Sequence, residues 1–292
     1  MTETSTPTPT PDARRYVPED PDEPEIPLLG GDVTEGLVRV GGTVRRAPSR
    51  NAAYVHALLD HLEAKGFEGA PRYLGIDASG REVVTFIEGE VAGRPHPDWL
   101  ADEARIASVT RLVRACDEAA LDFVPPEGAQ FVTGPPPPPG LPAAPPHEPE
   151  IVGHLDITPE NVVFRDGEAY ALIDFDLARP CARVDELYNV MLWWAPLNDP
   201  QDVAPALRDV DVPRRCRIIA DAYGMTDRDR EHLVEVALMR TRLAWHLMKH
   251  RAEVDGGGWQ RMWDEGVGDI IRRREAWLEQ HGSDVEAALL AA

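Results

Sequence analysis

The chain has 292 residues, of which 30 are Lys or Arg and 51 are Asp or Glu, so its formal net charge at pH 7 is −21. This length suits one large domain or two small ones with a substantial core. Hydrophobic residues at 43% and charged residues at 28% are near the globular average and argue against a fully disordered chain. The acidity argues against nucleic acid or an anionic membrane surface as the main partner. It suits a cationic ligand, or serves solubility alone.

Cysteine usage and the absence of apolar runs indicate the compartment. Cys116, Cys181 and Cys216 are far apart in sequence and form no C-x-x-C pair, so neither a zinc site nor a disulfide framework is indicated. No apolar run approaches the roughly 20 residues that span a bilayer, and the N-terminus has no apolar signal region. We therefore expect a soluble, cytoplasmic protein with no membrane partner.

Proline clusters divide the chain. Of the 28 prolines, seven lie in residues 1–30 and eleven in residues 125–149. The first cluster is also rich in acidic residues, and proline with like charge cannot build a core, so residues 1–27 are predicted to be a disordered acidic tail. The second cluster is predicted to be an extended surface loop or spacer at residues 125–149.

The region between the two proline clusters begins with strand patterns. Leu37 to Val44 alternates apolar and polar residues around Gly41-Gly42, and paired glycines supply the positive φ angles of a tight hairpin turn. A helix and two more strands are expected after it, at residues 52–65, 72–76 and 82–87. Residues 28–90 are thus predicted to form a small sheet with one helix.

Helical patterns dominate the rest of the chain. Apolar residues at helical spacing predict helices at residues 98–122, 184–197, 214–223, 227–253 and 258–281. Between the first two of these, a hairpin is predicted from strands at 161–165 and 169–173, joined by the turn Asp166-Gly167.

The most informative stretch surrounds this hairpin. His154, Asp156 and Asn161 form the pattern H-x-D-x-x-x-x-N, and I-D-F-D follows with Asp174 and Asp176. A hairpin brings the ends of its strands together, and a carboxylate with a carboxamide is a ligand set that Mg²⁺ accepts beside water and phosphate oxygens. A further carboxylate can orient a hydroxyl and accept its proton. A role as turn residues explains Asp174 and Asp176 poorly, because they follow an apolar strand where charge is costly.

These motifs resemble the catalytic core of the aminoglycoside phosphotransferase family, the small-molecule branch of the protein-kinase-like superfamily. Protein kinases carry H-R-D-x-x-x-x-N and D-F-G, and the small-molecule enzymes carry H-G-D-x-x-x-x-N and I-D, where this chain has H-L-D and I-D-F-D. The match is strong over residues 150–190. It implies an α+β, two-lobed protein-kinase-like fold, with a nucleotide-binding N-lobe at 28–90 and a helical C-lobe at 91–292.

The resemblance also implies a reaction and a role for each matching residue. The reaction is Mg²⁺-dependent transfer of the γ-phosphoryl group of ATP or GTP to a hydroxyl of a small molecule, such as an aminoglycoside or another amino or sugar alcohol. Asp156 matches the catalytic base, Asn161 and Asp174 match the Mg²⁺ ligands, and His154 matches the histidine that braces the catalytic loop.

Two further acids have less defined roles in this resemblance. Asp176 stands where protein kinases have the glycine of D-F-G, and it is either a third acidic ligand or an anchor behind the ligands. Asp185, in V-D-E-L, resembles the family's downstream D-L-A motif and is expected to support the C-lobe.

The nucleotide-anchoring residues depart from the family. The family has a strand lysine paired with a helix glutamate, but the two lysines of this chain, Lys65 and Lys249, do not fit by order. The nearest cations are Arg45 and Arg46, and arginine binds phosphate differently from lysine. The purine base is expected at the backbone of the hinge residues Phe86, Ile87 and Glu88. The missing lysine leaves one alternative open, a catalytically weak or inactive kinase-like protein that binds a nucleotide or small molecule.

Overall fold

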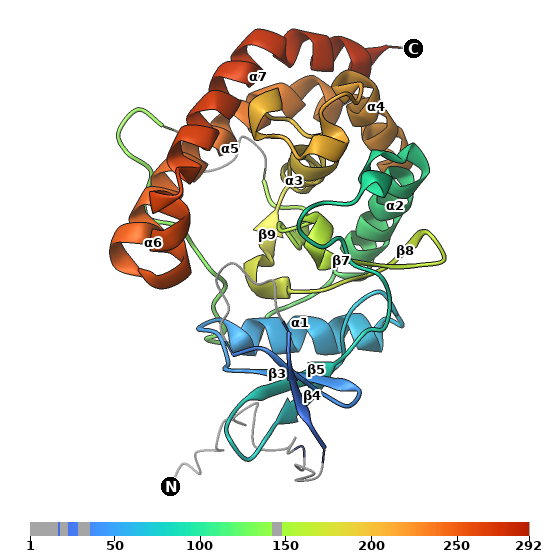
Figure 1. Cartoon of the computed structure of the whole chain (residues 1–292), viewed down its shortest axis with the longest axis vertical. Coiled ribbons are helices and arrows are strands. Elements are labelled where there is room, and N and C mark those ends of the chain that lie inside the picture. The colour runs from blue at the N-terminus through green and yellow to red at the C-terminus, as the bar shows by residue number, and fades with distance from the viewer. Residues whose placement is uncertain (1–16, 18–22, 29–35, 142–147, 292) are drawn as a thin grey trace, which may run out of the picture.

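A computed structural model describes residues 17, 23–28, 36–141 and 148–291, which form two lobes (Figure 1). The smaller lobe holds an antiparallel sheet with one helix, and the larger lobe is mostly helical. The predicted α+β, two-lobed class is therefore confirmed. Most of the predicted tail (residues 1–16 and 18–22) and residues 142–147 of the proline-rich loop lie outside the described residues.

The sheet of the small lobe has five strands in the order β1-β2-β3-β5-β4. Their bounds are β1 Glu25–Pro27, β2 Val38–Val40, β3 Thr43–Arg46, β4 Tyr73–Ile76 and β5 Glu82–Thr85. The predicted hairpin is present as β2 and β3, and Gly41 in its turn has a φ of 54°, which glycine adopts without strain. Strand β1 lies inside the segment predicted as a disordered tail. Its sequence carries no strand pattern, and the strand forms because its backbone pairs with β2.

Helix α1 (Ala52–Ala64) lies between this sheet and the helical lobe (Figure 1). Its apolar residues recur at helical spacing, and Val55, Leu58 and Leu62 are all buried. Each such side chain contributes about 1.5–3 kcal/mol by leaving water. Burial of these apolar residues therefore fixes α1 on the sheet, and it also fixes where the polar residues of the same face lie relative to the strands.

The larger lobe is built from six helices within the described part of the chain. Their bounds are α2 Glu103–Ala119, α3 Arg183–Trp194, α4 Val212–Tyr223, α5 Asp227–Val254, α6 Gly257–Asp264 and α7 Val267–Leu290. Two predicted helices are divided in the structure. Asp102 accepts a hydrogen bond from the Ala104 amide and starts α2 after a 3₁₀ turn at Asp98–Ala101. Gly266, with a φ of 95°, separates α6 from α7.

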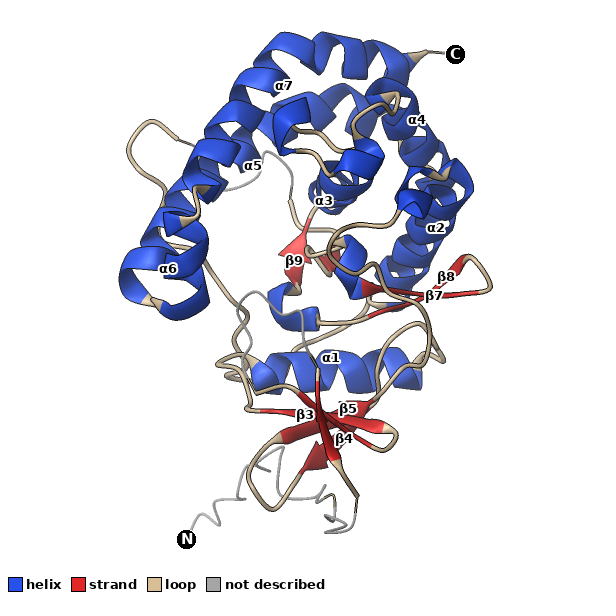
Figure 2. Cartoon of the chain, in the orientation of Figure 1, coloured by secondary structure: helices blue, strands red, loops and turns tan. Residues whose placement is uncertain are grey.

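Two short antiparallel sheets lie at the junction of the lobes (Figure 2). One pairs β6 (Ile151–Gly153) with β9 (Arg179–Cys181), and the other pairs β7 (Val162–Arg165) with β8 (Glu168–Leu172). The second is the predicted hairpin with its turn at Asp166-Gly167, where both residues have a positive φ. The motif residues singled out in the sequence sit at the ends of these strands.

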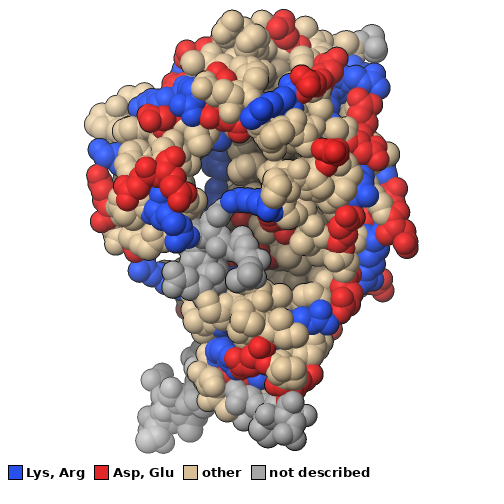
Figure 3. All heavy atoms as spheres, viewed as in Figure 1, with Lys and Arg blue, Asp and Glu red and all other residues tan. Residues whose placement is uncertain are grey.

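Charge is mixed on the molecular surface. Figure 3 shows Lys and Arg side chains interspersed with Asp and Glu on the face drawn, rather than one uninterrupted acidic field. No helix of the described residues combines the length and apolarity that crossing a membrane requires.

Candidate active site

His154 joins the two motifs. Its Nε2 donates to the carbonyl oxygen of Ile173 at 3.0 Å, and because a carbonyl only accepts, Nε2 carries the hydrogen. Nδ1 is then the acceptor for the Asp156 amide at 3.3 Å. Burial lowers the pKa of His154 to about 4, so the imidazole is neutral at physiological pH. His154 thus fastens the loop after β6 to the end of β8.

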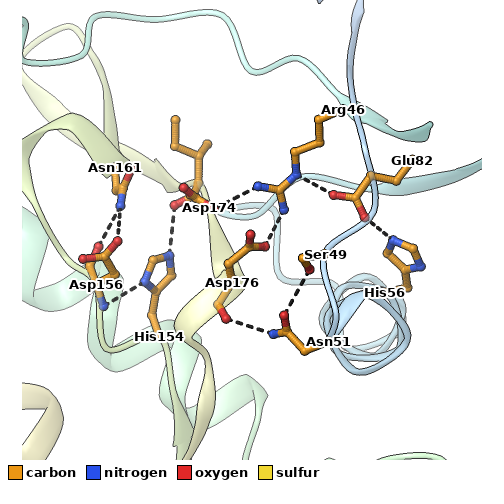
Figure 4. A network of polar contacts seen from close by, with 11 residues as sticks. Arg46, Ser49, Asn51, His56, Glu82, His154, Asp156, Asn161, Asp174 and Asp176 are labelled. Carbon is orange, nitrogen blue, oxygen red and sulfur yellow. Dashed lines mark hydrogen bonds and ion pairs between the residues drawn. The ribbon is translucent and has the colours of Figure 1, made fainter. Parts of the chain in front are cut away.

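Asp156 and Asn161 are in direct contact (Figure 4). The Asn161 side-chain amide donates to the Asp156 carboxylate and to its backbone carbonyl, both at 3.0 Å. The Ile173 amide donates to the Asn161 carbonyl at 2.9 Å, and Asp174 is the next residue. Asp174 has a left-handed φ of 65°, a conformation that Asp tolerates better than most residues. The structure therefore brings Asp156, Asn161 and Asp174 to one place.

The electrostatics of this place favour a cation. Burial raises the pKa of Asp156 to about 7, and the nearby charge of Asp174 adds to the shift. Burial likewise raises the pKa of Asp176, with Asp174 again adding to it. These carboxylates repel one another, and the Arg46 guanidinium, which pairs with Asp174 and Asp176, lowers the pKa of Asp176 and offsets part of that repulsion.

The donor set fits Mg²⁺ better than a zinc-type centre. The described ranges contain no group of three or more His, Cys, Asp and Glu residues that could hold a metal by themselves. Asn161 and Asp174 instead offer a carboxamide and a carboxylate. Mg²⁺ is commonly bound by one or two carboxylates and keeps its other positions for water and phosphate oxygens.

Helix α3 holds the backbone of the loop that carries His154 and Asp156. The Glu186 carboxylate accepts from the amides of His154 at 3.0 Å and Leu155 at 2.8 Å. Leu155 has a φ of 60°, which costs energy for a residue with a branched side chain. Asn189 accepts from the Ile157 amide at 2.7 Å, so the loop is held on both sides of Asp156.

The motif match points to Asp185, at the position of the family's D-L-A motif, and does not predict the contact of Glu186 with this loop. In the structure Asp185 is fully buried, 3.4 Å from the Arg240 guanidinium of α5, and so lies between α3 and α5 rather than against the loop. A signal for Glu186 was present in the sequence. Two adjacent acids stand at the start of a predicted helix, and adjacent helical residues point in different directions, so one of the two can face the preceding loop.

The two candidate arginines point to opposite faces of the small sheet. Arg45 is buried, with its guanidinium 3.4 Å from Asp77, on the side away from the motifs. Arg46 faces the motifs, where Nη1 lies 3.2 Å from Asp174 and Nη2 donates to Asp176 (Figure 4). The backbone carbonyl of Asp176 also accepts from the Asn51 side chain at 2.9 Å. Of the two candidates, Arg46 is the cation that the fold delivers to the site.

The predicted hinge, Phe86 to Glu88, makes hydrogen bonds with neighbouring residues of the chain. The Phe86 amide donates to Gly42 at 2.8 Å, and the Glu88 carbonyl accepts from Arg165 at 2.8 Å. The Arg39 guanidinium lies 3.9 Å over the Phe86 ring and pairs with the Glu88 carboxylate. The Phe86 amide and the Glu88 carbonyl, two of the backbone groups predicted to meet the purine base, are thus already hydrogen-bonded within the chain.

Comparison with known proteins finds one curated relative and several solved structures of similar fold. No protein-family model matches the chain. The trifolitoxin immunity protein of Rhizobium leguminosarum bv. trifolii is 33% identical to it over 224 residues, which is 72% of this chain and 78% of that protein.

Solved structures share the fold at low identity. A choline/ethanolamine kinase family protein from Mesorhizobium loti has a TM-score of 0.57 at 16% identity, covering 93% of this chain and 94% of its own. An amicoumacin kinase with AMP-PNP, Ca²⁺ and Ami has a TM-score of 0.55 at 12% identity, covering 92% and 91%. The GDP and kanamycin complex of APH(2″)-IIia has a TM-score of 0.51 at 15% identity, covering 89% and 93%. The chain therefore belongs to the family of the trifolitoxin immunity protein, and its fold is that of small-molecule kinases such as the choline/ethanolamine kinase family protein and the amicoumacin kinase.

Proposed function

We propose that this protein transfers the γ-phosphoryl group of ATP or GTP to a hydroxyl group of a small molecule, with Mg²⁺ as the metal. The observation that carries the proposal is the junction of Asp156, Asn161 and Asp174, which the fold holds together through His154 and Glu186. Two residues that can hold a metal ion and one that can accept a proton then share one site, and phosphoryl transfer to an alcohol uses both kinds of residue.

The roles follow from the local chemistry. Asp156 would accept the proton of the acceptor hydroxyl, and its raised pKa makes it a stronger base than an ordinary carboxylate. Asn161 and Asp174 would hold Mg²⁺, which when bound neutralises charge on the phosphates. Arg46 offers a planar guanidinium that can bind phosphate oxygens in pairs.

The acceptor is proposed to be an amine-bearing compound with a free hydroxyl, modified in the cytoplasm. The named relative confers immunity to trifolitoxin, and the structures of similar fold include an amicoumacin kinase and a kanamycin complex. Phosphorylating an antimicrobial compound would protect the cell, and a net charge of −21 favours a cationic acceptor over an anionic one.

Replacing Asp156 by Asn tests this function. The variant should keep its fold and its nucleotide affinity while turnover falls by about 10²- to 10⁴-fold, the usual contribution of a positioned general base. Release of ADP or GDP is measured while a panel of hydroxyl-bearing amines is supplied. Asp166→Asn, at the exposed hairpin turn, is the matched control and should leave turnover unchanged. Full turnover by Asp156→Asn would reject the mechanism.

A second candidate function is binding without transfer. It is favoured by the contact of Arg46 with Asp174, because a guanidinium on a metal-ligand carboxylate opposes metal entry. A protein of this kind would bind nucleotide or acceptor in calorimetry and would release no ADP or GDP with any member of the panel.

A further inference from the structure

The register of the small sheet places Glu82 directly opposite Arg46. The two residues are cross-strand partners on β5 and β3, so their side chains extend on the same face. Arg46 Nε donates to Glu82 Oε1 at 2.5 Å, and the Glu82 side chain is only 3% exposed. A buried carboxylate thus occupies the Nε side of the guanidinium and leaves the Nη side facing the site.

His56 completes a chain of contacts from the helix. Its Nε2 lies 2.6 Å from the second Glu82 oxygen, and because a carboxylate accepts, His56 is the donor. Burial opposes ionisation of Glu82, but the hydrogen bond from His56 and the charge of Arg46 outweigh it and lower the pKa of Glu82 below its usual value. The His56 ring stacks on Tyr73 of β4 with centroids 3.6 Å apart and planes within 9°. Its orientation is therefore set by its bond to Glu82, which Figure 4 shows, and by its stacking on Tyr73.

This arrangement restricts the Arg46 side chain. A free arginine side chain has about 2 kcal/mol of rotamer entropy to lose when it is fixed. Glu82 fixes the guanidinium plane before any ligand arrives, and the two Nη groups then reach Asp174 and Asp176 of the opposite lobe. An arginine prepared in this way binds an anion at lower entropic cost than a mobile one.

We propose that Glu82 and His56 are positioning residues for nucleotide binding. The relay His56–Glu82–Arg46 holds Arg46 as the cation for the phosphates and takes the place of the strand lysine and helix glutamate that the chain lacks. The helix supplies a hydrogen-bond donor instead of a carboxylate, and the carboxylate comes from the neighbouring strand. This inference rests on the proposed function, since it assigns the phosphate contact of that same site.

Nucleotide affinity separates the relay from a merely structural ion cluster. Dissociation constants for Mg²⁺-ATP and Mg²⁺-GTP are measured by calorimetry on the full chain, and each variant is checked by its melting temperature. Glu82→Gln should weaken the preferred nucleotide about tenfold, and Arg46→Met by about 10- to 100-fold, as expected for a charge-assisted contact. His56→Met should weaken it, whereas His56→Gln, which keeps an N–H donor, should restore most of the affinity. Glu63→Gln, an exposed change on the same helix, should have no effect.

A double-mutant cycle gives the decisive comparison. If Glu82 acts through Arg46, then adding Glu82→Gln to Arg46→Met costs no further affinity, because the residue it positions is already gone. Independent losses that multiply would overturn the relay, as would unchanged affinity in Glu82→Gln and His56→Met proteins that melt like the wild type.

The outcomes also separate the relay from the proposed function. A protein that binds nucleotide through this cycle but phosphorylates no acceptor would retain the relay and lose the function. A protein that phosphorylates an acceptor and shows independent losses would keep the function and lose the relay. Wild-type protein that binds neither nucleotide would overturn both.

Discussion

A single buried imidazole holds the geometry of the site. His154 donates to the Ile173 carbonyl and accepts from the Asp156 amide, and the second of these bonds requires the neutral ring with its hydrogen on Nε2. Protonation would put a hydrogen on Nδ1, where the Asp156 amide already points. Burial of the ring lowers the pKa of His154 to about 4, which keeps the imidazole neutral at physiological pH.

The pH dependence of stability should report on this residue. The folded pKa of about 4 lies below the unfolded value of 6.5, so the contribution of His154 is complete above pH 6.5 and is lost as pH falls toward 4. Between pH 7 and pH 5 the wild type should lose about 2 kcal/mol more than His154→Gln.

Urea unfolding of both proteins at the two pH values measures this difference. Asp156 titrates in the same range with the opposite sign, since its folded pKa is raised, but it does so in both proteins and cancels in the comparison. Equal losses in the wild type and the variant would contradict a neutral His154.

At the scale of elements, buried Arg215 joins three parts of the helical lobe. From helix α4 it donates to the carbonyl of Trp194, which ends α3, and to those of Leu100 and Ala101 in the 3₁₀ turn before α2, all at 2.8 Å. Carbonyl groups at helix ends lack partners within the helix. One guanidinium therefore supplies hydrogen-bond donors to the carbonyl groups at the C-terminal ends of α3 and of the 3₁₀ turn.

Neighbouring arginines on α4 give a matched test of this role. Arg215→Met should destabilise the protein by about 2–4 kcal/mol, because it leaves buried carbonyls without donors. Arg214→Met removes only an exposed pair with Glu103 and should cost less than about 1 kcal/mol. Chemical denaturation of the two variants is the measurement, and equal effects would show that the buried bonds add nothing.

Sequence patterns predicted most elements but not all of their ends or contacts. The β2–β3 hairpin and helix α1 follow from glycine pairs and helical spacing, which are local signals. Strand β1 was not predicted, because its three residues are exposed and depend on backbone pairing with β2. The division between α6 and α7 depends on one glycine, Gly266, whose positive φ the sequence alone does not show.

The same distinction applies to the site. Asp156, Asn161 and Asp174 were found because motif spacing within about one hairpin brings them together. Glu82 and His56 are far apart in sequence and meet only through the pairing of β3 with β5 and the seating of α1 on the sheet. Contacts of this kind depend on register, which short motifs do not carry.

At the scale of the whole molecule, polar contacts cross between the lobes around the site. Arg46 and Asn51 of the small lobe reach Asp174 and Asp176, and Glu90 and Phe164 exchange backbone hydrogen bonds of 2.9 and 2.7 Å. A nucleotide bound between the lobes would make contacts with both lobes at once. Binding should therefore stabilise the entire fold rather than the small lobe alone.

Thermal unfolding with and without ligand tests this coupling. At a nucleotide concentration of 100 times the dissociation constant, binding adds about 2.7 kcal/mol, which for a chain of this size raises the melting temperature by roughly 4–5 °C in one cooperative transition. The increase should require Mg²⁺ and should largely vanish in Asp174→Asn, while Asp166→Asn keeps it. Two separate transitions would mean that the lobes melt independently. A full increase in Asp174→Asn would mean that the nucleotide binds without the metal site, because the carboxylate on which that site depends would then be dispensable.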